Sequence, residues 1–249
     1  MGTPNISSSL TVADIQQDTT WTCKAVNSIN ELLGTTNESV TLSVSAIVLF
    51  GPDVPTITYS ILPNISYSGI ARDNISLFEG SSVQVLCTAK SRPASIISWS
   101  PYTDGDKLTL FNITRSTPLN YTCIATNTMR STMNESMTAG NSSSIYIRVL
   151  HGPENISAFY NNVTKIDRVL KVIKGLSFTI KCNASSEPPA RFSWFGPKNQ
   201  IGNVLFVTSV DKLSTSQPTC SAVNTMVDSI GNRLIKSQNL TFLLDILCK

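Results

Sequence analysis

The chain has 249 residues, 41% of them hydrophobic and 14% charged, which is enough apolar material for one large domain or for two to three small ones. Its formal net charge of +3 comes from scattered Lys and Arg residues, so no run is dense enough to follow a nucleic acid or an anionic membrane surface. The longest apolar run, residues 44–50, is much shorter than the roughly 18 residues of a membrane span. We therefore expect no nucleic-acid partner, and membrane attachment only through a segment outside this sequence.

The first predicted element is a strand marked by an alternating apolar triplet. The triplet comprises Leu10, Val12 and Ile15. The segment WTCKAVN follows, with Cys23 at its centre, and an alternating run, VTLSVSAIVLF, then predicts another strand. That run ends at the Gly51-Pro52 pair, which is typical of a turn or a domain junction.

The same frame returns twice, as YTCIATN around Cys123 and as PTCSAVN around Cys220, with a period of about 100 residues. Each copy also has a preceding apolar triplet and a following alternating run, which is IYIRVLHGP in the second copy and LTFLLDILCK in the third. The later triplets are Leu108, Leu110 and Ile113, and Leu205, Val207 and Val210. The chain is therefore predicted to repeat one plan of strands three times.

The second and third copies contain a further cysteine, Cys87 or Cys182, at the end of the alternating run SVQVLC or SFTIKC. A tryptophan, Trp99 or Trp194, follows each of these cysteines at the same spacing. Short strands bounded by turn residues, with Cys, Trp and Cys in that order, are the pattern of an immunoglobulin sandwich.

Over essentially its whole length the chain resembles the immunoglobulin superfamily, on CTAKSRPASIISW and YTCIATN in the middle and on CNASSEPPARFSW and PTCSAVN at the end. The stretches from Cys to Trp are most similar to adhesion molecules of the carcinoembryonic-antigen type and their invertebrate relatives. The resemblance implies an all-β fold of tandem immunoglobulin-like β-sandwiches, one partial and two complete, in an extended rod. It also implies that Cys87 and Cys182 lie on strand B, Trp99 and Trp194 on strand C, and Cys123 and Cys220 on strand F.

The resemblance further implies the disulfides Cys87–Cys123 and Cys182–Cys220, in an oxidising compartment. Each would close a loop of about 37 residues and stabilise its domain by about 4 kcal/mol.

The third copy departs from the family in front of its strand F cysteine. Members usually have a tyrosine there, whose hydroxyl bonds to upstream backbone. Tyr121 keeps that hydroxyl in the second copy, whereas the first copy has Trp21 and the third has Pro218. Because proline has no N–H to donate, strand F of the third domain is expected to begin loosely or at a sheet edge.

The expected domains are residues 1–51, a partial domain with strands E to G only, and residues 52–151 and 152–249, two complete domains. The partner of Cys23 would then precede Met1, so we expect the chain to be an internal fragment of a longer protein. Cys248 occupies the junction position that Phe50 and His151 hold in the earlier copies, so it has no expected partner in its own domain. A Cys23–Cys248 pair would need the two ends of the rod to meet, and both cysteines are expected to be unpaired.

Alternation predicts the two cores. In the second domain these residues are Val85, Cys87, Ile97, Trp99, Leu108, Leu110, Tyr121, Cys123 and Ala125. In the third they are Phe178, Ile180, Cys182, Phe192, Trp194, Leu205, Val207, Cys220 and Ala222.

The polar residues give no sign of a catalytic or metal site. A zinc site needs four closely spaced ligands and a catalytic cysteine needs a histidine, whereas the chain has no Cys-x-x-Cys pair and one histidine, His151. We interpret His151 as a solvated linker side chain, and Asp104 and Asp106 as part of a turn rather than a calcium site. The prediction is a protein that is not an enzyme and that holds no metal and no cofactor. The alternative is a signalling receptor whose catalytic domain lies outside this sequence.

Asn-x-Ser/Thr sequons, the acceptors of N-linked glycans, are more than twice as frequent as the roughly five that random placement would give. They predict attached glycans and an extracellular location, at the cell surface in the full-length protein. Accidental sequons on a surface rich in Ser and Thr are the alternative. Glycosylation is expected to be least complete at Asn120 and Asn183, which adjoin core residues of strands F and B. The acceptors are Asn5, Asn37, Asn64, Asn74, Asn112, Asn120, Asn134, Asn141, Asn155, Asn162, Asn183 and Asn239.

Three functions fit the expected fold. The domains could bind cell-surface or matrix proteins, including copies of themselves, as part of an adhesion or recognition receptor; they could belong to a secreted immune-recognition or matrix protein; or they could be spacers. If they bind, the outward residues of strands C and F in the middle domain form the candidate binding face, for which a solvated sheet face is the alternative. These residues are Ser98, Ser100, Thr122, Ile124 and Thr126, with Ile124 as the exposed apolar member.

Overall fold

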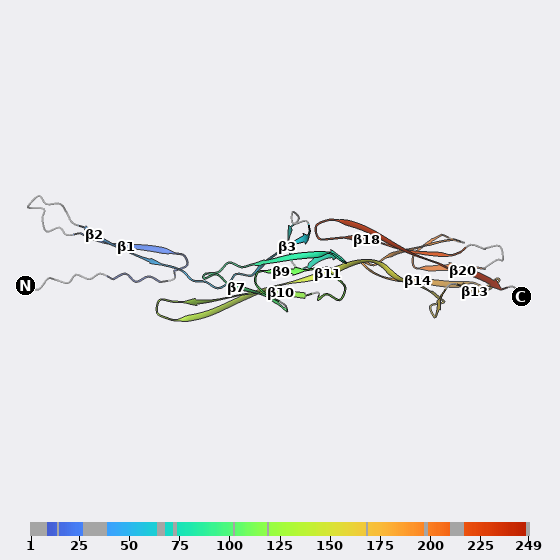
Figure 1. Cartoon of the computed structure of the whole chain (residues 1–249), viewed down its shortest axis with the longest axis horizontal. Coiled ribbons are helices and arrows are strands. Elements are labelled where there is room, and N and C mark those ends of the chain that lie inside the picture. The colour runs from blue at the N-terminus through green and yellow to red at the C-terminus, as the bar shows by residue number, and fades with distance from the viewer. Residues whose placement is uncertain are drawn as a thin grey trace, which may run out of the picture. The chain divides into compact units, whose positions relative to one another are not determined.

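The computed structural model describes residues 9–13, 15–26, 39–63, 68–71, 74–101, 103–118, 120–167, 169–196, 199–209 and 217–247 (Figure 1). Every regular element within them is a strand. The chain forms two compact units, which are described separately. The first unit comprises Met1–Val54, Ala89–Ile96 and Ala125–Asn141, and the second comprises Pro55–Thr88, Ile97–Ile124 and Ser142–Lys249.

The strands follow one another closely along the chain. They are β1 (Thr19–Val26), β2 (Ser39–Ala46), β3 (Thr56–Leu62), β4 (Ser68–Ala71), β5 (Asn74–Phe78), β6 (Ser82–Thr88), β7 (Ile96–Ser100), β8 (Thr103–Asp104), β9 (Lys107–Leu110), β10 (Asn120–Arg130), β11 (Ser136–Tyr160), β12 (Thr164–Ile166), β13 (Val169–Ile173), β14 (Phe178–Glu187), β15 (Arg191–Phe195), β16 (Gln200–Ile201), β17 (Val204–Val207), β18 (Thr219–Val227), β19 (Arg233–Thr241) and β20 (Leu243–Leu247).

In the first unit, β1 and β2 form an antiparallel hairpin in which Cys23 pairs with Leu42. The strand predicted through Leu10, Val12 and Ile15 is wrong, because these residues are irregular and exposed. The equivalent strands of the other copies, β9 and β17, pair with the cysteine-bearing strands β6 and β14. No strand of that kind occurs among the described residues of the first unit, and an apolar segment without a strand to pair with does not form a sheet.

The second copy of the repeat forms a sandwich, called here the second sandwich. One sheet has the strand order β4-β3-β6-β9, and the other contains β11, β10, β7 and β8, with β5 parallel to β11. Side chains of β6 alternate, and Val83, Val85 and Cys87 face inward. The Cys87–Cys123 disulfide joins β6 to β10 across the sandwich, with the two Cα atoms 6.4 Å apart.

The third copy forms the third sandwich with the same plan. One sheet contains β17, β14 and β11, to which β12 is added, and the other has the order β16-β15-β18-β19. The disulfide Cys182–Cys220 joins β14 to β18, with the Cα atoms 6.5 Å apart. The parallel pair β13–β20 repeats the parallel pair β5–β11 of the second sandwich. The predicted all-β fold of tandem sandwiches is confirmed.

The core positions predicted from alternation are buried, except that Ile97, Leu110, Phe192 and Val207 are partly buried and pack against the edge of each core. The prediction missed the core residues that the parallel strand pairs supply. These are Ile75, Leu77, Ile145 and Ile147 in the second sandwich and Leu170, Val172 and Leu244 in the third.

Strand F of the third sandwich, β18, does not begin loosely or at an edge. It begins at Thr219, directly after Pro218, and lies between β15 and β19. Pro218 is buried, and its main-chain O accepts a hydrogen bond of 3.2 Å from the N–H of Phe242. The expectation was wrong because the proline lies one residue outside the strand, where no ladder hydrogen bond needs its missing N–H.

One strand, β11, connects the second sandwich to the third without an intervening linker (Figure 1). It is 25 residues long and runs through the Gly152-Pro153 pair. His151 lies within it, pairs with Glu187 of β14 and is 8% exposed. The interpretation of His151 as a solvated linker side chain is therefore wrong, since no linker exists at this position for it to occupy.

Candidate functional site

The described residues contain no group of three or more His, Cys, Asp or Glu side chains that could hold a metal ion. In the same residues, no helix is long and apolar enough to cross a membrane. The segment from Asp104 to Asp106 forms the turn between β8 and β9, with Gly105 at φ 111°. The main-chain O of Asp106 accepts hydrogen bonds from Cys87 N (2.8 Å) and Trp99 Nε1 (3.3 Å). The segment is thus a turn, as predicted, and the structure adds that Asp106 binds two groups of the core.

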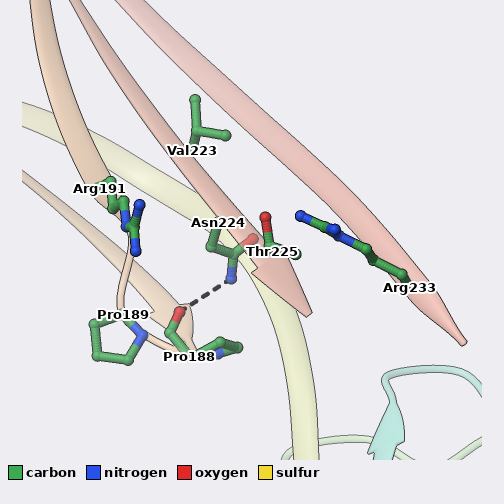
Figure 2. Close-up of a pocket in the computed structure, with 7 residues that line it drawn as sticks. All are labelled: Pro188, Pro189, Arg191, Val223, Asn224, Thr225 and Arg233. Carbon is green, nitrogen blue, oxygen red and sulfur yellow. Dashed lines mark hydrogen bonds between the residues drawn. The ribbon is translucent and has the colours of Figure 1, made fainter. Parts of the chain in front are cut away.

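The junction between the second and third sandwiches is closed by the side-chain amide of Asn224, the last residue of the PTCSAVN frame. Asn224 is 3% exposed. Its Nδ2 donates to the main-chain O of His151 at 2.9 Å and of Pro188 at 3.0 Å, and Figure 2 shows the second of these bonds. One amide therefore ties strand F to β11 where it enters the third sandwich and to the loop between strands B and C.

The same arrangement occurs in the first unit at Asn127, the last residue of YTCIATN. Asn127 is 5% exposed, and its Nδ2 donates to the main-chain O of Phe50 (3.0 Å) and of Pro93 (2.8 Å). Phe50 also forms an isolated bridge with Arg92. The final Asn of the repeated frame is thus a junction residue in both copies, which we call the junction asparagine.

Glycine is required in both Gly-Pro pairs because strand G approaches too closely for a side chain. A Cβ on Gly51 would lie 2.6 Å from Cβ of Ala139, and a Cβ on Gly152 would lie 2.7 Å from Cβ of Lys236. These glycines therefore mark close packing at a junction.

Charged side chains also form ion pairs along the junction between the second and third sandwiches, called here the second junction. The Arg115 guanidinium donates to Glu79 at 3.0 Å and to Glu154 at 2.8 Å, and Arg148 pairs with Glu187. The hydrogen bonds to Glu79 and Glu154, in that order of size, raise the pKa of Arg115. All these groups are partly exposed, so we expect each pair to orient the junction and to add little stability.

The turn between β18 and β19 of the third sandwich also contacts the second sandwich. Ser229 N donates to Ser76 O (3.0 Å), Ser76 N donates to Ser229 Oγ (2.7 Å), and the Tyr59 hydroxyl donates to Ser229 O (3.1 Å). Ile230 packs against the core of the second sandwich. The buried carboxylate of Asp228 holds the turn in shape by accepting N–H groups within it.

A cavity of about 470 Å³ opens on the third sandwich beside the junction asparagine. The guanidinium groups of Arg191, from β15, and Arg233, from β19, stand on either side of Asn224 and Thr225 (Figure 2). Both arginines are exposed, and no carboxylate among the described residues pairs with either. The cavity is lined by Pro188, Pro189, Arg191, Val223, Asn224, Thr225 and Arg233.

The binding face predicted on strands C and F is less exposed than expected. Ser100 and Thr126 are exposed, whereas Ser98, Thr122 and Ile124 are half-buried. Ile124 is therefore not the exposed apolar residue that was predicted, because β10 lies between β11 and β7 and neighbouring side chains cover part of it. Binding through these residues stays a prediction.

The two predicted core tryptophans, Trp99 and Trp194, are buried in the same clusters as the disulfides. Cys23 is exposed and forms no disulfide with any described residue. Predictions for Cys248, Val210, Asn5, Asn37 and Asn64 concern positions outside the described residues. Of the other sequon asparagines, Asn141 is half-buried, and the exposed ones are Asn74, Asn112, Asn120, Asn134, Asn155, Asn162, Asn183 and Asn239.

Two sheets joined by a B-to-F disulfide, with a buried strand C tryptophan, define the architecture of both sandwiches. The fold is that of immunoglobulin domains. No protein-family model matches the sequence. Among solved structures the chain is similar to Dpr2 Ig1-Ig2 in complex with DIP-Theta Ig1-Ig3, with 18% identity and a TM-score of 0.45, over 83% of this chain and 69% of that chain.

Two further immunoglobulin structures are similar to the chain. DIP-gamma Ig1 and Ig2 match with 15% identity and a TM-score of 0.48, over 78% of this chain and 98% of that chain. The N-terminal four Ig domains of Dscam1 isoform 1.9 match with 16% identity and a TM-score of 0.44, over 84% of this chain and 51% of that chain. The chain thus spans about half of the Dscam1 structure.

Sequence reasoning missed the junction asparagines and the cavity in these immunoglobulin-like domains. The asparagine had a visible signal, since it ends the frame around Cys123 and around Cys220. The cavity had none, because Arg191 and Arg233 are far apart in sequence and line one cavity only through the pairing of β15 and β19 with β18.

Proposed function

We propose that the chain is an extracellular segment of a cell-surface adhesion or recognition receptor, whose immunoglobulin-like domains bind other proteins. The observation that carries the proposal is the direct connection of two disulfide-bridged sandwiches by β11, closed by Asn224. Disulfides persist in oxidising compartments. Domains joined without a linker suit a receptor that must present a binding surface in a fixed direction.

Exposed sequon asparagines support the extracellular location. Asn112, Asn134, Asn155 and Asn162 are exposed and have positive φ angles between 48° and 62°. Such backbone conformations are typical of turns, although Asn155 lies within β11 at a register shift. Exposure leaves all four side-chain amides open to glycan transfer. We expect chain secreted from animal cells to lose mass on glycosidase treatment, and an unchanged mass would contradict the extracellular assignment.

A spacer within such a receptor is the second candidate function, and the closed second junction favours it. A secreted recognition or matrix protein, and a signalling receptor with a catalytic domain outside this sequence, would use the same domains. The fold alone does not distinguish these roles.

Beads coated with the secreted, glycosylated chain test the proposal. We expect the beads to aggregate or to capture cells, and Ile124→Asp to abolish this if strands C and F form the contact. Thr88→Asp is the matched control, because Thr88 is exposed on the opposite sheet of the same sandwich. A fluorescence unfolding curve should show that both variants stay folded. If the beads neither aggregate nor capture cells, the binding function is rejected and the spacer function is supported.

A further inference from the structure

We propose that the cavity between Arg191 and Arg233 binds an acidic segment of a partner protein, with a Glu or Asp carboxylate held by the two guanidinium groups. The inference rests on the proposed function, which it deepens by placing a recognition site on the third sandwich and by assigning acidic chemistry to the partner.

The two arginines are not required by the fold, as the second sandwich shows. Counted from the strand B and strand F cysteines, Arg191 corresponds to Ile96 and Arg233 to Ser136. The junction asparagine, in contrast, is the same in both sandwiches. The same architecture accepts an isoleucine and a serine at these two positions, so the fold does not require an arginine at either.

The charges in the cavity are not neutralised by described residues. Arg92, Arg115 and Arg148 each contact a carboxylate, whereas Arg191 and Arg233 contact none within the described part of the chain. Glu187 adjoins the cavity-lining Pro188, but it pairs with Arg148. Two unpaired guanidinium groups facing one cavity attract an anion, and their planar donors match a carboxylate.

The other lining residues fit a peptide better than a bare anion. Pro189 is exposed and Val223 is half-buried, so both offer apolar surface to the methylene groups of an acidic side chain. The half-buried Thr225 adds a hydroxyl that can donate a hydrogen bond. A volume of about 470 Å³ lies within the usual range for ligand sites and holds a side chain together with part of its backbone.

The site is held in place before any ligand arrives. Arg191 pairs with Val223 in the sheet register, Arg233 pairs with Val227, and the amide of Asn224 fixes Pro188. A site whose backbone is already ordered loses less entropy on binding. A protein segment is favoured over a sulfated polysaccharide because the cavity presents two cations rather than a long basic row.

Selection from a phage library of random peptides on the immobilised, secreted chain tests this inference. We expect enrichment of peptides that contain Glu or Asp, and loss of that enrichment on Arg191→Gln/Arg233→Gln. The matched control is Arg130→Gln/Lys165→Gln, which removes the same charge from two exposed residues elsewhere and should behave like the wild type. Fluorescence anisotropy should then show that changing the selected Glu or Asp to Gln or Asn weakens binding about tenfold, as expected for lost charge-assisted hydrogen bonds.

The inference is overturned if no acidic peptide is enriched, if the amide versions bind equally well, or if the control variant loses binding as much as the cavity variant. Binding of heparin fragments without binding of acidic peptides would replace it with a polysaccharide site. The outcome is separable from the proposed function, because bead aggregation that survives Arg191→Gln/Arg233→Gln would keep adhesion while rejecting this site as its cause.

Discussion

At the first junction, in the first unit, Asn127 bonds to Phe50 and Pro93, while at the second, in the second unit, Asn224 bonds to His151 and Pro188. In both cases the asparagine amide donates to two main-chain carbonyls at equivalent positions of the repeat. The surroundings differ: the second junction adds a continuous strand and a docked turn, whereas β2 ends at residue 46, before the first junction. The shared amide therefore sets the basic connection, and the remaining contacts determine how firmly it closes.

An ion pair occurs at the same position of both junctions, but the positive and negative partners are exchanged. Arg92 and Glu187 each precede the proline whose carbonyl the junction asparagine binds, and they pair with Asp18 and Arg148 of the preceding copy. The residue before this proline thus forms an ion pair with the preceding copy in both cases, and it can be either the cation or the anion of the pair.

The turns between strands F and G have the same length but different environments. Ile230 packs against the core of the second sandwich, and the equivalent Met133 is 85% exposed. Ile230 reaches the side where β3 and β5 lie. Among the described residues of the first unit no such strands precede β1, so Met133 has no comparable surface to pack on.

The largest expected effect comes from the core of the second sandwich, which supports the second junction through Ile230. Trp99 is 3% exposed, and Trp99→Ala should lower the free energy of unfolding by about 3 to 5 kcal/mol through the cavity it leaves. Denaturant unfolding followed by far-UV circular dichroism measures this. Trp21→Ala is the control, because Trp21 lies on the exposed β1–β2 hairpin and its loss should leave the second sandwich intact.

Removing a junction asparagine is the next largest change. Asn224→Ala leaves the main-chain O of the buried His151 and of the half-buried Pro188 without this donor, and should cost about 2 to 4 kcal/mol. Asn127→Ala removes the same bonds at the first junction. Asn199→Ala, at an exposed asparagine of the third sandwich, is expected to cost less than about 0.5 kcal/mol.

Hydrogen exchange sharpens the comparison between the two asparagine variants. Asn127→Ala should accelerate exchange of the amides in the Phe50–Arg92 bridge, because the main-chain O of Phe50 accepts from both Arg92 N and Asn127 Nδ2 and loses the second donor. Asn224→Ala should accelerate the exchange of β11 amides less, because the Ser229 contacts remain. Equal acceleration at both junctions would contradict the view that the docked turn strengthens the second.

The sequence predicted both sandwiches because alternation and cysteine spacing are local signals that survive in the fold, and the resemblance to the immunoglobulin superfamily implied their disulfides. It did not predict the continuity of β11, because Gly152-Pro153 resembles a turn when only neighbouring residues are considered. The glycine is there because Lys236 lies against it, a contact between residues distant in sequence. His151 was misjudged for the same reason, since its burial depends on strand β14 and not on its neighbours in the chain.

A smaller effect is expected from the matched turn residues. Ile230→Ala should cost about 1 to 2 kcal/mol, less than for a fully buried isoleucine because Ile230 is only half-buried. Met133→Ala should change the free energy of unfolding by less than about 0.5 kcal/mol, because its side chain is exposed. Thermal unfolding of the two variants provides the measurement. A larger loss for Met133→Ala would show that the two turns do not differ as described.

The smallest expected effect is an acid dependence of the first junction. The main-chain N–H of Val48, and then Arg92, lower the pKa of Asp18 by hydrogen bonding to its carboxylate. A carboxyl group whose pKa is lower in the folded state stabilises that state above its unfolded pKa, and the contribution is lost as the pH falls through the folded pKa. Exchange of the Phe50 amide should therefore accelerate as the pH is lowered below about 4, after correction for intrinsic rates. Asp18→Asn should remove that acceleration, whereas Arg92→Gln should keep part of it because the Val48 bond remains. An unchanged acceleration in Asp18→Asn would assign the acid dependence to another group.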